Sequence, residues 1–382
     1  MMKNYKVRYF DYPLQFRVHE AEYMEIIRDV LSRGAYILGD DTRRFEKNLA
    51  AFTGSKYAVG VGNCTDALLL SLYAAGIGAG DEVITVSHTF AATVEVIKFL
   101  GATPVFVDIA DDHNMDVRLL ESAITPKTKA IVPVQLNGRI CTDMDKIVDL
   151  AKKYNLLIIE DSAQALGASY RGKGAGTFGL AGCFSFYPAK LLGTFGDAGA
   201  IVTDDEGFAE KLMMLRNHGR GKGTDIERWG LNCRIDNLHS AILDYKMTLL
   251  QGWINRRREI AGMYNEELSG TGELRLPPPA DGGSHYDVFQ NYEIEAEDRD
   301  NLVKYLNEMG VEILLPWGGK AVHQFEALGL GGVNLPRTGE LFRKVVMLPM
   351  YPELSDSQIR YIAGVINDFY GVRVSAVKTG AG

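Results

Sequence analysis

Short apolar runs alternate with longer amphipathic segments over much of the chain. Runs such as 57–61, 82–86 and 156–159 predict buried strands, because apolar residues occupy both of their faces. The segments between such runs, for example 91–100 and 144–154, predict helices. Repeated units of strand and helix imply an α/β fold in which helices cover a mainly parallel sheet.

A different pattern begins near residue 245, where the regular alternation ends. The elements predicted from here on are more varied and include a turn-rich connection over 274–283. They are helices over 238–253, 256–268 and 298–309, strands over 288–294 and 311–315, and a last helix that opens with the capping residues Ser355 and Gln358. This pattern predicts a small α+β domain. The polar stretch that precedes it, 216–230, predicts a mobile surface loop.

The length of 382 residues suggests two or three domains. We therefore expect a large domain over 1–245, a small domain over 246–374 and a disordered tail over 375–382. The large domain begins with an N-terminal lead-in, in which 20–33 and 41–52 repeat apolar residues at helical spacing.

Charge and cysteine usage exclude several classes of protein. The net charge is −8 and the charges are interspersed, so nothing favours binding to nucleic acid or to an anionic membrane. The four cysteines are far apart, which is typical of reduced thiols rather than of a disulfide framework or a zinc site. The polar N-terminus lacks the apolar core of a signal peptide, and no apolar run reaches transmembrane length. We therefore expect a soluble, cytoplasmic protein.

The strongest candidate for chemistry is Lys190. An apolar and aromatic run that predicts a buried strand ends at Pro188, which has no N–H group to donate to a sheet. Lys190 follows among small and apolar residues, where burial would lower the pKa of its amine and make it nucleophilic. A lysine that forms a Schiff base needs these properties. The alternative is a surface lysine whose stem lies along apolar residues, and for a lysine considered alone that alternative is the more common one.

Three other candidates follow strands of the predicted sheet, at the carboxyl ends where α/β proteins bind ligands. The turn over 63–66 leads from a strand into a helix, which suits a phosphate, although an ordinary helix cap by Asn63 or Thr65 is as plausible. Asp161 could cap a helix or pair with a ligand cation. Phe90 could face the same crevice or simply pack in the core.

Together these residues resemble the DegT/DnrJ/EryC1/StrS family of sugar aminotransferases, which are fold type I pyridoxal-phosphate enzymes. The resemblance extends over nearly the whole chain, from about 36–39 to 348–352. Its motifs occur in order, and their conjunction is specific. They are Gly80-Asp81-Glu82-Val83-Ile84, Thr89-Phe90-Ala91-Ala92-Thr93, Glu160-Asp161-Ser162-Ala163-Gln164, Ser185-Phe186-Tyr187-Pro188-Ala189-Lys190, Leu215-Arg216-Asn217-His218-Gly219 and Gly230-Leu231-Asn232-Cys233-Arg234.

The resemblance implies a role for each candidate at the cofactor ring. Lys190 would bind pyridoxal 5′-phosphate covalently, and Asp161 would pair with the protonated ring nitrogen. Gln164 would lie against the 3′ oxygen, and Phe90 would stack on the ring face. Such a site needs no metal.

The resemblance also implies how the phosphate is held and how the chain assembles. Thr65 and Asp66 would bind the phosphate largely through backbone N–H groups, together with the hydroxyl of Ser185. Asn232 would reach the phosphate in the neighbouring subunit, which implies a homodimer with shared sites. The chain departs from the family at Cys64, where a glycine is common, and at Gln290-Asn291, where a histidine is frequent.

The function implied by the resemblance is the transfer of an amino group from glutamate or glutamine to a nucleotide-linked keto sugar, for amino-sugar or surface polysaccharide biosynthesis. The segment Gly196-Asp197-Ala198-Gly199 is more similar to members that aminate C3 of the sugar than to those that aminate C4. A 4-keto sugar therefore remains the alternative substrate. A catalytically silent, cofactor-binding regulatory protein is the alternative from another class, although the presence of Lys190, Asp161 and Gln164 disfavours it.

Overall fold

The computed structural model describes residues 5–221, 223, 225–280 and 283–372. The predicted tail over 375–382 lies outside the described residues, and so do Lys222 in the predicted surface loop and Gly282 in the turn-rich connection.

The described residues form a central sheet of seven strands in the order β1-β9-β8-β5-β4-β2-β3. Strand β9 runs antiparallel to β1 and β8, and the pairs from β8 to β3 are parallel. The predicted α/β fold with a mainly parallel sheet is therefore confirmed. The strands are β1 (Tyr57–Val61), β2 (Glu82–Thr85), β3 (Thr103–Phe106), β4 (Thr128–Ile131), β5 (Leu157–Asp161), β8 (Ala181–Ser185) and β9 (Gly199–Thr203).

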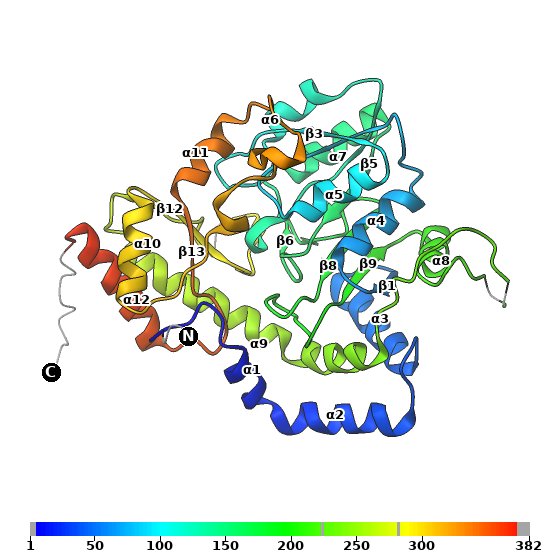
Figure 1. Ribbon diagram of the computed structural model, residues 1–382, viewed down its shortest axis with the longest axis horizontal. Coiled ribbons are helices and arrows are strands. Elements are labelled where there is room, and N and C mark those ends of the chain that lie inside the picture. The colour runs from blue at the N-terminus through cyan, green and yellow to red at the C-terminus, as the bar shows by residue number, and fades with distance from the viewer. Residues whose placement is uncertain (1–4, 222, 224, 281–282, 373–382) are drawn as a thin grey trace.

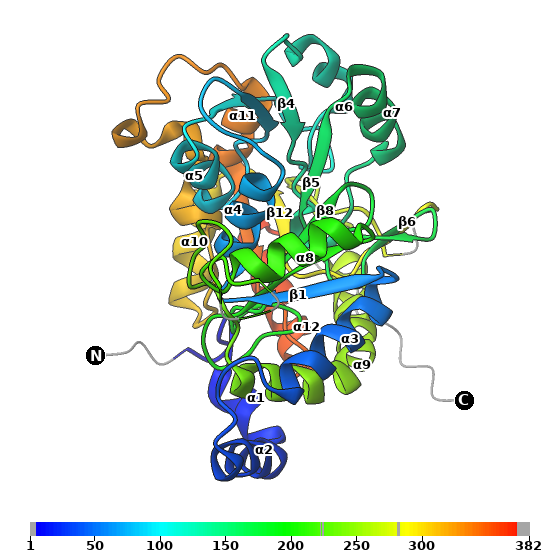
Figure 2. The ribbon, with the colours of Figure 1, turned by 90° about the vertical axis from the view of Figure 1, so that its right-hand side faces the viewer.

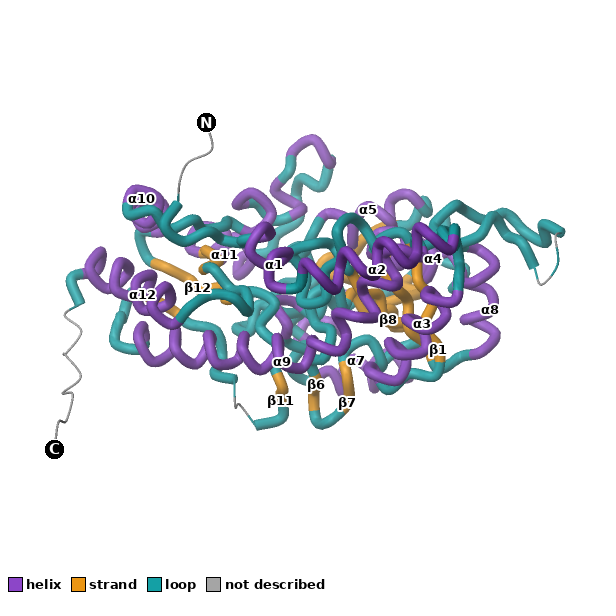
Figure 3. The backbone as a smooth tube through the Cα atoms, turned by 90° about the horizontal axis from the view of Figure 1, so that it is seen from below, coloured by secondary structure: helices purple, strands orange, loops and turns teal. Residues whose placement is uncertain are grey.

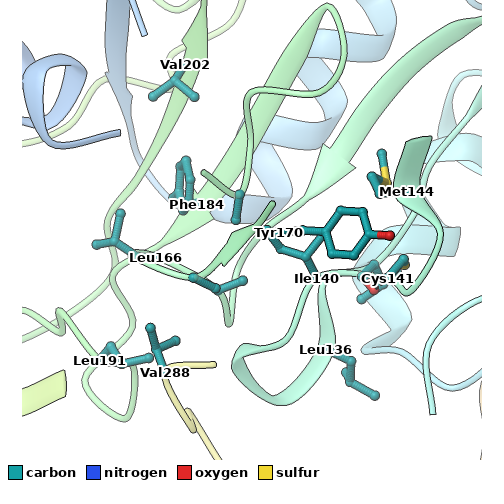
Figure 4. Packing of buried hydrophobic residues seen from close by; sticks show 14 of the residues in the cluster. Leu136, Ile140, Cys141, Met144, Leu166, Tyr170, Phe184, Leu191, Val202 and Val288 are labelled. Carbon is teal, nitrogen blue, oxygen red and sulfur yellow. Dashed lines mark hydrogen bonds between the residues drawn. The ribbon is translucent and has the colours of Figure 1, made fainter. Parts of the chain in front are cut away.

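Helices cover both faces of this sheet, because its strands are apolar on both sides (Figures 1 and 2). One face packs against α4 (Cys64–Ala74), α5 (Ala91–Phe99) and α8 (Glu206–Leu215). The other face packs against α3 (Asp40–Thr53), α7 (Met144–Tyr154) and α9 (Asn237–Leu268). Figure 4 shows part of this second cluster, which also contains Leu191, the residue after the candidate lysine.

A smaller sheet lies at one end of the molecule, beside the C-terminal half of α9 (Figure 3). Its strands are antiparallel and pack against α10 (Arg299–Glu308) and α12 (Asp356–Tyr370). They are β10 (Leu274–Arg275), β12 (Tyr292–Ala296) and β13 (Val345–Leu348). Val7, near the N-terminus, belongs to the same apolar cluster, so the two ends of the chain share one core.

The remaining elements are short or lie at the periphery. The lead-in contains α1 (Tyr12–Val18) and the predicted helix α2 (Glu20–Arg33). Helix α6 (Val117–Leu120) precedes β4, and α11 (Pro336–Lys344) precedes β13. A third, separate sheet pairs β11 with β6 and β6 with β7, and so joins the region after residue 282 to the segment between β5 and β8. Its strands are β6 (Ser169–Tyr170), β7 (Lys173–Gly174) and β11 (His285–Tyr286).

The prediction of separate helices over 238–253 and 256–268 is wrong, because α9 is continuous. Ile254 is buried within α9, and the polar residues 255–258 contain neither glycine nor proline, so nothing interrupts the helix there. The predicted boundary at residue 245 falls inside this helix, and the division into two domains stays a prediction.

The strands predicted over 288–294 and 311–315 are also partly wrong. Strand β12 begins only at Tyr292, because Phe289 has a φ of 49°, a left-handed conformation that cannot continue a strand. Residues 311–315 form only the isolated bridges of Val311 with Val7 and of Leu314 with Met347. Helix α11 and strand β13 were not predicted.

Among the described residues, we find no helix that combines the length and the apolar character required to cross a membrane.

Candidate functional site

A cavity of about 450 Å³ opens at the edge of the sheet where β1, β2, β5 and β8 end. Among the residues predicted for the site, Thr65, Phe90, Asp161, Gln164, Ser185 and Lys190 line this cavity. Asp66 and Asn232 are not among the described residues that line it. The structure therefore brings together side chains that lie more than a hundred residues apart in the sequence.

Lys190 stands on the irregular segment between β8 and β9, where its backbone N–H donates to the carbonyl of Tyr187 at 2.8 Å. Burial lowers the pKa of the lysine amine, while the nearby Cys64 thiol and Asp161 carboxylate oppose this shift. The environment thus favours the neutral, nucleophilic form of the amine. This position does not match the alternative of a solvated surface lysine, because Lys190 is half-buried and lines the cavity.

Asp161 is the last residue of β5, and its carboxylate is almost fully buried. One carboxylate oxygen, Oδ2, accepts a hydrogen bond from the hydroxyl of Thr93 at 2.7 Å, and the other accepts from the N–H of Ala163 at 3.2 Å. Burial raises the pKa of Asp161, and these two hydrogen bonds and the charge of Lys190 act against that rise. A cation bound beside the carboxylate would lower its pKa further and hold it ionised.

The turn after β1 forms the N-terminus of α4. Asn63 caps the helix, since its Oδ1 accepts from the N–H of Asp66 at 2.8 Å and its Nδ2 donates to the Asp66 carboxylate at 3.0 Å. The predicted cap by Asn63 is therefore present. This cap binds the N–H of Asp66. The N–H groups of Cys64 and Thr65 also lie in the first turn, where a helix provides no backbone acceptor, so they can bind a ligand.

The first residue of β9, Gly199, packs directly against the turn at Asn63. A Cβ atom on Gly199 would lie only 2.4 Å from the carbonyl carbon of Asn63, so glycine is required for this close approach. Ser185, at the end of the neighbouring strand β8, accepts a weak hydrogen bond from the N–H of Tyr187 at 3.4 Å, and its own O–H remains a potential donor. Together, the helix N-terminus and this hydroxyl form a wall that suits an anion.

Phe90 forms the N-cap position of α5, and 58% of its surface is exposed, so the alternative of simple core packing is wrong. Its ring centroid lies 5.7 Å from that of Trp317, with the two ring planes tilted by 49°. Trp317 was missed in the sequence, as were Tyr9 and Phe10, which also line the cavity. The aromatic character of the N-terminal residues was the only signal that could have indicated Tyr9 and Phe10, and no comparable signal indicated Trp317.

Gln164 is held by two partners that lie outside the central sheet. Its Oε1 accepts from the backbone N–H of Asn137 at 2.7 Å and from Nδ2 of Asn291 at 3.2 Å. The amide oxygen of Gln164 is therefore occupied, and its NH₂ group is left to donate to an oxygen atom in the cavity. Gln290, the residue before Asn291, lines the cavity as well.

Asn232 lies in a loop away from the cavity lining. It is exposed and forms an isolated antiparallel bridge with Asn217. Its predicted contact with a neighbouring subunit stays a prediction.

The residues of the cavity fit pyridoxal phosphate. The cofactor requires an amine for its aldehyde, a carboxylate for its ring nitrogen and a site for its phosphate. Lys190 supplies the amine, Asp161 is a buried carboxylate, and the N-terminus of α4 faces the same cavity. These three groups are the donor set that the cofactor needs.

Similarity to known proteins extends over most of the chain. A model of the DegT/DnrJ/EryC1/StrS aminotransferase family matches residues 18–367. A protein of Geobacillus stearothermophilus named pleiotropic regulatory protein is 40% identical over 93% of this chain and 96% of its own length. A dTDP-3-amino-3,4,6-trideoxy-alpha-D-glucose transaminase of Micromonospora megalomicea subsp. nigra is 40% identical over 93% of this chain and 97% of its own length.

A third relative, a UDP-N-acetyl-3-dehydro-alpha-D-glucosamine 3-aminotransferase of Acidithiobacillus ferrooxidans, is 39% identical over 96% of this chain and 98% of its own length. Among solved structures, DesV of S. venezuelae in complex with a ketimine intermediate superposes with a TM-score of 0.92 and 37% identity, over 97% of this chain and 99% of that chain. This likeness confirms the predicted fold type I aminotransferase architecture.

Proposed function

We propose a function on the premise that this chain belongs to the DegT/DnrJ/EryC1/StrS aminotransferase family. The protein is a pyridoxal-phosphate enzyme that transfers an amino group from glutamate or glutamine to C3 of a nucleotide-linked keto sugar. The observation that carries this proposal is the presence of Lys190, Asp161 and the N-terminus of α4 around one cavity.

Each residue around the cavity has a separate role in the proposed reaction. The bound cofactor supplies an electron sink for the carbon that loses its proton. Asp161 holds a proton at the ring nitrogen, and Lys190 Nζ binds the cofactor and then moves a proton at the amino-donor carbon. Ser185 and the first-turn N–H groups of α4 hold the phosphate and so fix the ring while its other end reacts. These N–H groups are those of Cys64 and Thr65, in place of the expected N–H of Asp66, which already donates to Asn63.

Two observations support C3 as the aminated position. Asp197, in the segment Gly196-Asp197-Ala198-Gly199, lines the cavity, so this segment can contact a ligand rather than only pack beneath one. Two transaminases among the relatives are named for different nucleotides, dTDP and UDP, and both names place the amino group at position 3. A 4-keto sugar is the alternative substrate.

We also propose a homodimer. Asn232 is exposed and does not line the cavity of its own chain, as expected for a residue that contacts the cofactor of a partner subunit. In the same proposal, the large domain over 1–245 binds the cofactor. The small domain over 246–374 contributes the opposite side of the cavity, with Gln290, Asn291 and Trp317.

One relative keeps the second class of function open, because the Geobacillus protein is named as a regulatory protein. A silent cofactor binder would need no proton carrier and would leave the cofactor in its aldehyde form. Half-transamination with glutamate decides between the two functions. An enzyme converts the bound cofactor to its amine form, which shifts the absorbance, and a silent binder does not.

The substrate is tested by offering matched UDP- and dTDP-linked 3-keto and 4-keto sugars, with glutamate or glutamine as the donor. We expect a new amine at C3, which NMR of the product locates. Amination only at C4, or only of a sugar without a nucleotide, would overturn the proposed substrate and leave the cofactor site standing.

A further inference from the structure

Gln290 binds the backbone on both sides of Lys190. Its Oε1 accepts from the N–H of Leu191 at 2.7 Å, and its Nε2 donates to the carbonyl of Ala189 at 2.8 Å. Gln290 is only 3% exposed, and both ends of its amide are engaged. These neutral hydrogen bonds fix the peptide units that flank the lysine without adding a charge beside its amine.

The loop that carries Gln290 is itself held rigidly. The buried guanidinium of Arg257 donates through Nη1 to the carbonyls of Phe289, Gln290 and Met350, at 3.1, 3.0 and 2.9 Å. On its other side, the N–H of Val288 donates to the carbonyl of Gly138 at 2.9 Å. A Cβ atom on Gly138 would lie 2.7 Å from the backbone nitrogen of Phe289, so the two segments are in direct contact.

Apolar packing reinforces the same contact. Val288 and Leu191 belong to one buried cluster, which Figure 4 shows. The segment that contains the lysine is thus joined to the loop over 288–291 by side-chain packing as well as by the amide of Gln290. A displacement of one would be transmitted to the other.

Asn291, the next residue, performs a parallel task at another point of the cavity. Its Nδ2 donates to Oε1 of Gln164 at 3.2 Å and to Oδ1 of Asn137 at 2.9 Å. Two adjacent side chains of one loop therefore hold Lys190 and Gln164, which come from different segments beyond the central sheet.

We propose that Gln290 and Asn291 are paired positioning residues, which fix the direction of the Lys190 amine and of the Gln164 amide relative to each other. This inference rests on the proposed cofactor site. Gln290 acts through the peptide units on either side of Lys190, and Asn291 acts through the amide oxygen of Gln164. Together they would set the geometry of two contacts with the cofactor, the covalent bond at Lys190 and the hydrogen bond from Gln164 to the 3′ oxygen. Each substitution should therefore affect one of these contacts and spare the other.

The test is a double-mutant cycle on cofactor affinity. Gln290→Met removes both hydrogen bonds and keeps a side chain of similar length. In the otherwise native protein, we expect the dissociation constant of pyridoxal phosphate to rise about tenfold. We also expect the pH midpoint of the visible band of the Lys190–cofactor adduct to shift. In the Lys190→Ala background, the same substitution should change the dissociation constant less than twofold, because the residue on which it acts is gone.

A second cycle tests Asn291. Asn291→Leu should change the wavelength of the visible band and should leave the covalent attachment at Lys190 intact. In the Gln164→Leu background it should cause no further change in wavelength.

Asn367→Leu is the matched control. Asn367 is 2% exposed, its Oδ1 accepts from the hydroxyl of Thr271 at 2.6 Å, and its Nδ2 donates to the carbonyl of Glu267 at 3.0 Å. The variant loses a similar pair of hydrogen bonds, which join α12 to the C-terminal end of α9 and the residues just after it, away from the cavity lining. We expect lower stability and unchanged cofactor readouts.

If Gln290→Met does not fold, Gln290→Asn takes its place, since an amide that is one methylene shorter cannot span both peptide units. Equal weakening of cofactor binding with and without Lys190, or no weakening at all, would overturn the inference about Gln290. If Asn291→Leu and Gln164→Leu changed the wavelength of the visible band additively, Asn291 would not act through Gln164, and the inference about Asn291 would be overturned. A native protein that borohydride does not label at Lys190 would instead overturn the proposed cofactor site, and the inference with it.

Discussion

The cavity has two walls that differ in how the backbone carries their side chains. The strand-end wall consists of Thr65, Asp161, Ser185 and Lys190, which stand at or directly after the ends of buried strands. The loop wall consists of Tyr9, Gln290, Asn291 and Trp317, which stand on irregular backbone. Trp317 itself has a φ of 54°, which is unusual for a large aromatic residue.

Different forces therefore hold the two walls. The strand-end wall is fixed by the hydrogen-bonded ladder of the sheet and by the apolar clusters on both of its faces. The loop wall continues into β12, where Glu293 and Glu295 bind His113 from the segment after β3, at 2.7 and 3.1 Å. Arg337 donates to the second oxygen of Glu295 at 3.0 Å. Behind the loop wall, charged side chains rather than a ladder therefore join β12 to the segment after β3.

Because the two walls are held differently, substitutions in them should have different effects on catalysis and on stability. Groups with a candidate chemical role stand on the strand-end wall, so substitutions there should cost catalysis with little loss of stability. The charged contacts behind the loop wall should contribute stability that depends on pH.

The largest effect is expected for Lys190→Ala. Loss of the proton carrier should lower turnover by at least about a thousandfold, within the range of general acid–base catalysis. The phosphate and Asp161 contacts remain, so the variant should still bind the cofactor without a covalent bond. Single-turnover kinetics and equilibrium binding of pyridoxal phosphate measure the two effects.

Lys246 supplies the control for this prediction. Burial lowers the pKa of Lys246 to about 8, and its Nζ donates to the carbonyl of Gly193 at 2.6 Å. A lowered pKa therefore does not by itself single out Lys190, but Lys246 is not among the described residues that line the main cavity. Borohydride should label Lys190 only, and label at Lys246 would contradict the assignment.

Asp161→Asn should have the next largest effect. The substitution removes a charge-assisted bond to the ring nitrogen, whose strength is about 1.5–3 kcal/mol. It also weakens the electron sink, so turnover should fall at least about a hundredfold. Thermal unfolding of the apoprotein should change little. Turnover close to that of the native protein would refute the pairing of Asp161 with the ring.

The same difference between the walls explains what the sequence could predict. A buried strand followed by Asp161, and another followed at Pro188 by Lys190, are local patterns, and the rule that ligands bind at strand ends places both at one edge. The parallel sheet and the candidates Thr65 and Phe90 follow from the same reasoning, whereas Ser185 was indicated only by the family resemblance. Local pattern and fold agree on this wall.

The loop wall offers no such pattern. Nothing local to Phe289 indicates its left-handed conformation, which delays the start of the predicted strand to Tyr292 and turns Gln290 toward the lysine. The partners of Gln290 are backbone groups about a hundred residues away, and any peptide unit could supply them. Contacts of this kind depend on tertiary structure alone, so the sequence indicated Gln290 and Asn291 only as departures from a family pattern.

His113→Gln tests the charged contacts behind the loop wall. Burial alone would lower the pKa of His113, but its hydrogen bonds to Glu293 and Glu295 raise the pKa from 6.5 to about 9. The charged histidine therefore contributes stability that is complete below about pH 6.5 and is lost as the pH rises through 9. Burial alone would raise the pKa of Glu295, but hydrogen bonds from His113 and Arg337 lower it to about 2. The stability that the charged pair contributes therefore also declines in acid, as Glu295 becomes protonated.

We expect His113→Gln to lower the free energy of unfolding by about 2–3 kcal/mol near pH 6, and by much less near pH 10. Melting temperatures of both proteins across this range measure the difference. A constant difference in melting temperature from pH 6 to pH 10 would show that packing, rather than charge, accounts for the loss. Labelling at Lys190 should be unaffected in the folded variant.

The smallest effect is expected for Thr93→Val, and a matched pair of threonines makes it measurable. Thr93 donates to the Asp161 carboxylate at 2.7 Å, and Thr338 donates to the Asp108 carboxylate at 2.6 Å. Both threonines are at most 1% exposed, so either valine variant loses one buried hydroxyl and should lose about 1–3 kcal/mol of stability. Only Thr93 acts on the strand-end wall.

Removal of the Thr93 hydroxyl takes away a hydrogen bond that favours the charged carboxylate, so the pKa of Asp161 should rise further. The acid limb of the pH profile of kcat/KM should then move to higher pH. Near neutral pH the loss of kcat/KM should be only about three- to tenfold. Thr338→Val should leave the profile in place at a similar cost in melting temperature. Equal shifts in both variants would mean that a loss of stability, and not the charge state of Asp161, limits the reaction on the acid side.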